Sequence, residues 1–577
     1  MVNPFCASVP ATDGSPRPGA WIWTPSPTGP RRIARVCFRR VLAMRKAATE
    51  AVLVISARTR YRLSVNGVIL GVGPGRSRPE HREADSYDLR EYLREGTNIV
   101  EVEVLHVSFT TFHHLAEPPG FVAWGNVVTG DGMRHDFATP GDWQCREREG
   151  VADHAPRLSF AQGPIEIADL RPERAPAWVA PVPAAAGTAP PPQPRRIPAL
   201  TRLPLAPLAV RRVPLAGDER MVCVRLVDDG NGPKAVPSRP RLVAARAWVY
   251  SPRAQRVGFG SWWGTYWLNG KALDKVVTTR HPLRQTMTAD LRDGWNRLHA
   301  LGETVFGYCE FCLAWPADAR LRVCAVREAA AEDALEVAGP LDADVAAAAR
   351  AELETDAASG ILVWRTQRCD PLHDSPLRRL AWADSSDAPP AAVTLPVTLA
   401  PSRPERLNID MGRIVLGSIA LDLEAPAGTV VDIGHAEQAT SEGRPDYGKA
   451  VTVYAADRYI LPGWRQCVET FDPRGFLHLE LRVDPPAGPV TVHAVHAIET
   501  RYPYAFEGAF ECSDADFTRL WGYGRRTLEL CSEDVLTDCP WRERTLYAGD
   551  MLAELGVTAG LTRDLRLVRR SIDVLLQ

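Results

Sequence analysis

The chain has 577 residues, and at about 150 residues per domain this length predicts roughly four domains, which excludes a single small binding module. Hydrophobic residues make up 45% and charged residues 24% of the sequence, as in folded soluble proteins, so a mostly disordered, collagen-like or polybasic chain is excluded. The 68 Lys and Arg residues nearly balance the 70 Asp and Glu residues, so the net charge favours neither nucleic acid nor an anionic membrane as a partner.

The N-terminal segment and the cysteines predict a cytoplasmic protein. Residues 1–21 carry several prolines and no apolar run of the kind that forms the core of a signal peptide, and no stretch approaches 18 consecutive apolar residues. The 12 cysteines show no framework spacing, which favours free thiols in a reducing compartment. Cys309 and Cys312 are the only close pair, and no second pair of ligands follows them. We therefore expect no metal and no other cofactor.

Two segments share one order of strand and turn signals. Each has alternating apolar residues that end in an Asn-Gly turn, then an Asp-Leu pair, then a Gly-x-Asn turn, then another strand. This order predicts two related β-sandwiches, although Asn-Gly turns are common enough for coincidence to remain the alternative. The first copy has Ala51–Val65, Asn66-Gly67, Asp88-Leu89 and Gly96-Thr97-Asn98, and the second has Tyr266–Leu268, Asn269-Gly270, Asp290-Leu291 and Gly294-Trp295-Asn296.

Further along the chain, composition marks the connections. Residues 176–207 are too rich in proline for a helix or a central strand, and they predict a linker or a surface strap in extended form. Residues 329–358 are rich in Ala and Glu and predict a helix or two, interrupted at Gly339-Pro340. Short strands with glycine turns follow and predict a third β domain. They lie at Ile414–Leu416, Ile419–Leu423, Val430–Ile433, Arg458–Leu461, Leu477–Val483 and Val490–His496.

After Phe510 the apolar period changes to that of helices. One helix is expected after Ser513, a second over Glu543–Leu555 and a third from Thr562, with Leu565, Val568, Ile572 and Leu575 as its apolar stripe. The whole pattern predicts a mainly β chain with a helical end. Its predicted parts are a β-sandwich at 20–150, a Pro-rich linker at 151–207, a second β-sandwich at 208–326, a helical or irregular connection at 327–395, a third β-sandwich at 396–503 and a helical region at 504–577.

The densest chemistry lies in the run from Thr537 to Asp550. Pro540 should keep Asp538 in a loop beside the start of a helix, and Glu543, Tyr547 and Asp550 follow at i, i+4 and i+7. This spacing predicts a carboxylate, an aromatic ring and a second carboxylate on one helical face, a composition typical of sugar sites. The alternative is that Asp538 is a helix N-cap and the other acids form a solvated face.

The same run resembles the entry motif of the catalytic domain of bacterial α-L-rhamnosidases, glycoside hydrolase family 78. The motif reads Asp538-Cys539-Pro540-x-Arg542-Glu543 and closes with Tyr547-x-Gly549-Asp550. The resemblance is firm over residues 406–550 and weaker over the first sandwich. Its other matching motifs are Asp410-Met411-Gly412, Gly417, Gly428-Thr429, His435-Ala436-Glu437, Asp457-Arg458-Tyr459, Gly475-Phe476 and Phe510-Glu511-Cys512-Ser513-Asp514.

The resemblance implies jelly-roll or galactose-binding-like and concanavalin-like sandwiches, followed by the first helices of an (α/α)6 six-hairpin toroid. It implies hydrolysis of terminal non-reducing α-L-rhamnose from glycosides or polysaccharides with inversion. Glu543 would be the general acid, Asp538, Arg542 and Asp550 would hold rhamnose hydroxyls, and Tyr547 would pack against the sugar. The partner would be a rhamnose-containing glycoside, with no nucleic acid and no membrane.

The sequence departs from the family in two respects. Thr545-Leu546 stands where Leu-Gly is expected. Residues 511–577 are too few for a toroid of about twelve helices of 11 or 12 residues, so we expect a C-terminally truncated chain that lacks the general base and is close to inactive alone. Two alternatives stay open. One is a non-catalytic carbohydrate-binding or structural protein of several sandwiches, and the other is a glycosidase of the same architecture with a different sugar preference.

Overall fold

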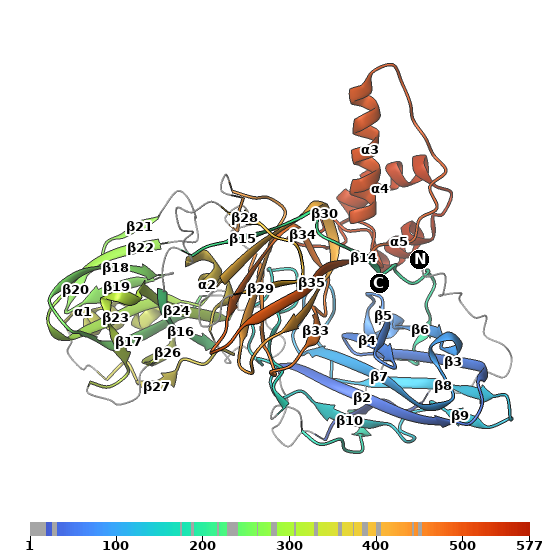
Figure 1. Cartoon of the computed structure of the whole chain (residues 1–577), viewed down its shortest axis with the longest axis horizontal. Coiled ribbons are helices and arrows are strands. Elements are labelled where there is room, and N and C mark those ends of the chain that lie inside the picture. Colours follow the sequence, from blue (N-terminus) through green and yellow to red (C-terminus); the bar gives the residue numbers. More distant parts are fainter. Residues whose placement is uncertain are drawn as a thin grey trace.

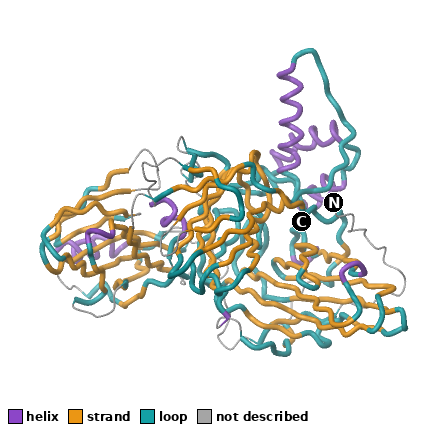
Figure 2. The backbone as a smooth tube through the Cα atoms, in the orientation of Figure 1, coloured by secondary structure: helices purple, strands orange, loops and turns teal. Residues whose placement is uncertain are grey.

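A computed structural model shows three β bodies and a helical segment that projects from them (Figures 1 and 2). The prediction of a mainly β chain with sandwiches followed by helices is confirmed. No helix in the described part of the chain is long and apolar enough to cross a lipid bilayer. The structure describes residues 19–25, 32–172, 176–185, 190–215, 219–227, 240–261, 264–277, 285–304, 307–327, 333–355, 360–372, 374–382, 390–399, 405–440, 443–447 and 453–577.

The first body is a sandwich of two mostly antiparallel sheets whose inward side chains form one core, including Phe38, Leu53 and Phe121. One sheet has the order β12 (Val182–Pro183), β1 (Ile22–Trp23), β8 (Phe121–Thr129), β3 (Ala48–Ala57), β6 (Glu83–Asp88) and β13 (Gln193–Pro194), with β9 (Arg134–Asp136) paired to β8. The other has the order β10 (Gln144–Glu147), β2 (Ile33–Met44), β7 (Gly96–Val107), β4 (Arg60–Val65) and β5 (Val68–Gly73).

The second body repeats this arrangement. One sheet has the order β16 (Glu219–Val227), β24 (Tyr308–Pro316), β18 (Gln255–Ser261), β22 (Gln285–Leu291) and β21 (Lys275–Val277). The other has β20 (Lys271–Ala272), β19 (Thr265–Leu268), β23 (Gly294–Glu303), β17 (Leu242–Ser251), β26 (Ala334–Leu341) and β27 (Arg365–Arg368), with β25 (Arg322–Cys324) paired to β17. The order β20-β19-β23-β17 corresponds to β5-β4-β7-β2 of the first sandwich, and β24-β18-β22 corresponds to β8-β3-β6.

Matching hydrogen bonds strengthen the relation between the two sandwiches. The amide of Asn66 donates to Asn98 Oδ1 at 2.9 Å, and that of Asn269 donates to Asn296 Oδ1 at 2.9 Å. Asn66 and Asn269 both have a φ of 51°, and a glycine with positive φ follows each of them, as a two-residue hairpin turn of type I′ requires. The shared strand order and the shared side-chain network together favour duplication over coincidence.

The third body is one large, strongly bent sheet with its own core, including Leu421, Phe476 and Leu481. Its strands agree with the predicted ones, except that the first two merge into one strand of 20 residues, β30 (Glu405–Glu424), with a register shift between Asp410 and Val415. The order is β11 (Ile167–Asp169), β32 (Ala456–Ile460), β31 (Val430–Ala436), β34 (Arg474–Asp484), β30, β15 (Ala209–Val213) and β28 (Ala391–Ala392). β33 (Gln466–Glu469) and β35 (Val490–Glu499) pair with β30, and β14 (Leu203–Leu205) and β29 (Val397–Leu399) pair with β35.

The two connections contain more strand than the sequence suggested. Strands β11 to β14 arise from 151–207 and lie at the edges of the first and third bodies, where proline is tolerated because an edge strand can leave one N–H side unpaired. The Ala-rich stretch forms one helix, α1 (Ala346–Thr355), but Ala334–Leu341 is strand β26 of the second sandwich rather than helix. Its side chains Leu335 and Val337 fill that core, and this burial overrides the helix propensity of alanine and glutamate.

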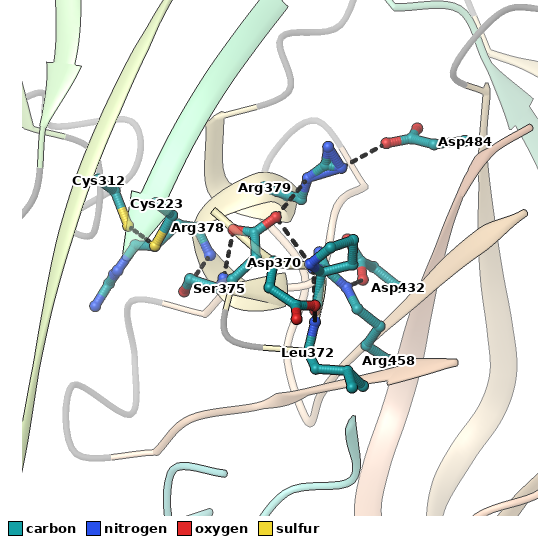
Figure 3. Close-up of polar contacts among 12 residues, drawn as sticks. Cys223, Cys312, Asp370, Leu372, Ser375, Arg378, Arg379, Asp432, Arg458 and Asp484 are labelled. Carbon is teal, nitrogen blue, oxygen red and sulfur yellow. Dashed lines mark hydrogen bonds and ion pairs between the residues drawn. The ribbon is translucent and has the colours of Figure 1, made fainter. Parts of the chain in front are cut away.

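Side-chain contacts join the second body, helix α2 (Pro376–Trp382) and the third body. Arg378 of α2 contacts Glu310 of β24 at 3.9 Å, and Arg379 of α2 forms an ion pair with Asp484 of β34 at 2.9 Å (Figure 3). Within the third body, Arg458 pairs with Asp432 at 2.6 Å. On the other side, Glu310 of β24 accepts a hydrogen bond from Tyr454 at 3.0 Å.

The helical segment contains α3 (Ala515–Leu530), α4 (Ala548–Leu561) and α5 (Arg566–Leu576). Asp514 caps α3 by accepting a hydrogen bond from Asp516 N at 2.8 Å. An incomplete toroid would leave the predicted apolar stripe exposed, and the structure divides it. Leu565 and Val568 pack into a core with Tyr502, Leu528 and Leu536, whereas Ile572 and Leu575 are exposed. Further exposed apolar side chains of the segment include Phe517, Leu520, Tyr523, Leu552 and Leu576.

Candidate active site

Four of the five predicted site residues, Asp538, Arg542, Glu543 and Tyr547, lie on the loop that joins α3 to α4, and Asp550 lies in the first turn of α4. The expected helix over Glu543–Leu555 begins later, because Tyr547 is the N-cap of α4 and residues 538–547 are not helical. Arg544 explains the late start, since its φ of 52° is left-handed and incompatible with a helix. The prediction that Glu543, Tyr547 and Asp550 share one helical face is therefore wrong in its geometry.

The same arginine anchors the loop in the protein interior. Arg544 is 2% exposed, and its guanidinium forms an ion pair with Glu533 at 2.5 Å. It also donates to the carbonyl oxygen of Pro473 at 2.9 Å and to Gln162 Oε1 at 3.3 Å. Glu533 in turn pairs with Arg76 of the first body at 3.0 Å. The unusual backbone at Arg544 is thus held by one ion pair and by hydrogen bonds to neutral acceptors from two other parts of the chain.

Glu543 lies between two donors. Arg542 contacts Glu543 Oε1 at 2.8 Å, and the Tyr547 hydroxyl donates to Oε2 at 2.7 Å. Burial and the Glu543 carboxylate raise the pKa of the Tyr547 hydroxyl above its ordinary value, so the phenol keeps its proton and acts as the donor. Glu543 is only 9% exposed. Both of its carboxyl oxygens have a hydrogen-bonding partner.

Asp538 holds the loop closed. Its Oδ1 accepts a hydrogen bond from Thr545 N at 2.8 Å, and its own N–H donates to the Thr545 carbonyl oxygen at 3.0 Å. The alternative that Asp538 is a helix N-cap is wrong, because Tyr547 occupies that position. Thr545, the residue that departs from the family motif, supplies the backbone groups for this pair and is buried.

A further acid, which the sequence analysis missed, lies near the site. Asp550 is exposed in the first turn of α4, and Glu554 follows it at i+4. Burial, together with the charges of Asp550 and Asp538, raises the pKa of Glu554 to about 8. The i+4 spacing from Asp550 was the available signal. The two site aspartates and Glu554 are therefore close enough to interact electrostatically.

The first body also reaches the loop, which no local pattern could indicate. His113 Nε2 lies 3.0 Å from the Glu543 carbonyl oxygen, and the Phe112 ring lies edge-on to the Tyr547 ring at 6.4 Å. Gln162 donates to the carbonyl oxygens of Trp541 and Arg542 at 2.6 Å and 3.0 Å. About 380 to 430 positions separate these partners along the chain, so only the folded structure brings them together.

Close packing beneath the loop depends on a glycine. A Cβ atom at Gly475 of β34 would lie 2.3 Å from the Pro540 carbonyl oxygen and 2.8 Å from the Trp541 Cα. Two cavities of about 40 Å³ each lie at the junction of the bodies, lined by residues such as Asp534 and His113. None of the five predicted site residues lines either of these two cavities.

The described residues show no group of three or more His, Cys, Asp or Glu side chains arranged to hold a metal ion. The sequence pair Cys309 and Cys312 does not act together: Cys309 belongs to the core of the second sandwich, whereas Cys312 faces Cys223 on the neighbouring strand. Alternation along β24 accounts for this difference in direction.

Comparison with known proteins gives two adjacent family matches. Residues 401–497 match the bacterial alpha-L-rhamnosidase concanavalin-like domain, and residues 505–575 match the bacterial alpha-L-rhamnosidase 6 hairpin glycosidase domain. An alpha-L-rhamnosidase of Streptomyces avermitilis is 29% identical over 180 residues, which are 28% of this chain and 17% of that protein. The chain thus spans less than a fifth of that relative's length.

A solved structure agrees over almost the whole chain. The GH78 family rhamnosidase of Bacillus sp. GL1 superposes with a TM-score of 0.78 at 24% identity, covering 97% of this chain and 63% of that one. This likeness shows the fold. The two domain matches show that residues 401–497 and 505–575 are of the bacterial α-L-rhamnosidase type.

Proposed function

We propose that this chain serves the hydrolysis of terminal non-reducing α-L-rhamnose from glycosides or polysaccharides, with inversion. The observation that carries the proposal is Glu543, a nearly buried carboxylate held between Arg542 and Tyr547 on the loop that enters the matched six-hairpin region. The two similar proteins are rhamnosidases, which supports rhamnose as the sugar.

In this proposal Glu543 is the general acid. Protonated Glu543 gives its proton to the glycosidic oxygen, the bond from that oxygen to the anomeric carbon breaks, and the leaving group departs as an alcohol. A water molecule adds to the anomeric carbon from the opposite face and passes a proton to a second carboxylate, which an inverting enzyme places about 6.5 to 9.5 Å from the acid. The α-linked substrate then yields β-L-rhamnose.

The neighbours of Glu543 bind the sugar. Asp538, Arg542 and Asp550 accept from or donate to rhamnose hydroxyls, and Tyr547 packs against the ring. The Arg542 side chain is 55% exposed, so it can turn from Glu543 to a substrate hydroxyl. This exchange releases Glu543 Oε1 from a cationic donor and leaves that oxygen available for a proton.

Glu543 supplies the general acid, and none of the described residues is assigned as the general base. We therefore expect residues 1–577 alone to release little p-nitrophenol from p-nitrophenyl α-L-rhamnopyranoside, because general acid and base groups each contribute about 10²- to 10⁴-fold. Robust turnover by residues 1–577 would place a base among them and contradict this point.

Sugar recognition can be tested separately from turnover. Titration with L-rhamnose, followed by saturation-transfer NMR, should show binding that Asp538→Asn abolishes. Asparagine keeps the oxygen that accepts from Thr545 N but loses the charge, so the loop should retain its shape. Binding of other pyranoses as well as L-rhamnose would favour a glycosidase with a different sugar preference, and absence of any sugar binding would contradict the proposal.

A further inference from the structure

We infer that Phe112 of the first sandwich, which lies beside Tyr547, forms the binding surface for the leaving group of the rhamnoside. The inference rests on the proposed function, because it needs Glu543 as the acid at the glycosidic oxygen. The leaving group would present a flat apolar face to Phe112, either an aromatic ring or the less polar face of a second sugar.

The geometry places an apolar surface beside the acid. Tyr547 has its hydroxyl on Glu543 at 2.7 Å and its ring edge-on to Phe112 at 6.4 Å. Phe112 in turn lies edge-on to Phe160 at 5.7 Å. The Phe112 side chain is 55% exposed, although an aromatic ring gains stability from burial. Three rings thus run outward from the acid, and the middle ring is largely open to solvent.

Polar and apolar groups are divided between two parts of the chain. The groups proposed to hold rhamnose hydroxyls, Asp538, Arg542 and Asp550, all come from the loop and from α4. Phe112 comes from the loop between β7 and β8 and offers only an apolar ring. The acid must face the glycosidic bond, which joins the rhamnose to the leaving group. The polar groups on one side of Glu543 therefore fit the rhamnose, and the apolar ring on the other side fits the leaving group.

Phe112 is held in place rather than free to fold away. Its N–H donates to the Ala161 carbonyl oxygen at 3.0 Å. The neighbouring Thr111 N–H donates to the His114 carbonyl oxygen at 2.9 Å, and the Thr111 hydroxyl lies 3.0 Å from His114 Nδ1. His113 contacts the Glu543 carbonyl oxygen. A ring on a loop that is fixed directly to the acid's own backbone is preorganised, which lowers the entropic cost of binding.

The experiment compares three rhamnosides on residues 1–577 by saturation-transfer NMR titration. The probes are methyl α-L-rhamnoside, p-nitrophenyl α-L-rhamnoside and α-L-rhamnosyl-(1→6)-D-glucose. The wild-type chain should bind the aryl compound more tightly than the methyl compound. Phe112→Ala should reduce this preference about 3- to 10-fold, as expected for loss of one aromatic contact, while binding of the methyl compound stays the same. Phe112→Trp should retain the preference.

The disaccharide separates the two sources of a flat face. If Phe112→Ala also reduces the affinity of the disaccharide relative to the methyl compound, the surface binds a second sugar. If it reduces only the relative affinity of the aryl compound, the surface binds an aromatic ring. Trp464 is a matched control, because it is 52% exposed and lies outside the site, so Trp464→Ala should change nothing. An unchanged aryl preference in Phe112→Ala would overturn the inference alone. Failure of the wild type to bind any of the three rhamnosides would overturn the proposed function and the inference with it.

Discussion

Gly475 is the residue at which a single methyl group should reach the candidate site. A Cβ atom there would lie 2.3 Å from the Pro540 carbonyl oxygen, so Gly475→Ala must displace the loop backbone. We expect a loss of stability of about 1 to 3 kcal/mol, typical of overpacking, and weaker rhamnose binding in an NMR titration. The matched control is Gly258→Ala in β18, where an added Cβ would meet no atom within 4 Å. Equal effects of the two variants would contradict this packing.

Arg544 should matter as a positioning residue. Arg544→Met removes one partner of a buried pair and leaves Glu533 with less compensation, which costs about 3 to 5 kcal/mol. Hydrogen exchange should then speed up over the loop and α4. Arg563→Met is the control, because its pair with Glu507 is 92% and 60% exposed and such pairs contribute about 0 to 1 kcal/mol. Unchanged exchange at the loop in Arg544→Met would show that the left-handed turn does not need its ion pair.

At the level of elements, α4 should respond to pH through Glu554. The pKa of Glu554 in the folded chain is raised to about 8, above the ordinary value of about 4.3 in an unfolded chain. The folded state therefore holds the proton more tightly, so the contribution is complete below about pH 4.3 and is lost as pH rises towards 8. The protection of the α4 amides, measured relative to their intrinsic exchange rates, should fall over this range, and Glu554→Gln should remove the fall. If the pH dependence of α4 protection is the same in Glu554→Gln, a group other than Glu554 causes it.

The strand predictions succeeded where side chains alternate and turns carry their own signature. The Asn-Gly turns fixed two hairpins, and the six strand segments of the third body all lie in strands. The helix at the active site was misplaced because the spacing of Glu543, Tyr547 and Asp550 fits a helix equally well, while the left-handed turn at Arg544 depends on Glu533, Gln162 and Pro473. Likewise, Phe112, His113 and Gln162 reach the site only through packing of the whole chain. The site residues themselves could be named from the motif, but their neighbours could not.

At the scale of the whole molecule, we propose the division at 20–150, 151–207, 208–326, 327–395, 396–503 and 504–577 for the order of the parts, with the boundaries of the second sandwich shifted, because β15 belongs to the third body. The paired strands β26 and β27 extend the second sandwich into the fourth part, and the linker strands bind the first and third bodies together. These connections make the first body a structural support of the active-site loop rather than a separate module.

Acid should loosen the contact between the first body and the loop. Burial lowers the pKa of His106 and of His114 to about 4, and burial together with Arg76 and Arg544 holds the pKa of His113 well below its ordinary value. A histidine whose pKa is lower in the folded than in the unfolded chain stabilises the fold above about pH 6.5, and this contribution is lost as pH falls towards 4. Limited proteolysis at the 108–120 loop should therefore increase below about pH 6. His113→Gln keeps a donor without a titrating ring and should reduce the effect, whereas equal cleavage at pH 7 and pH 4.5 would contradict it.

The most direct test of the central claim, that Glu543 is the acid of a rhamnosidase, is how its loss depends on the leaving group. The residual initial rates of residues 1–577, with and without Glu543→Gln, should be measured at high protein concentration for methyl α-L-rhamnoside and α-L-rhamnosyl fluoride. Fluoride leaves with little help from an acid, whereas methoxide must be protonated as it leaves. Glu543→Gln should therefore lower the rate about 10²- to 10⁴-fold with the methyl compound and much less with the fluoride. Equal losses on both substrates, or no loss on either, would contradict the assignment of Glu543 as the acid.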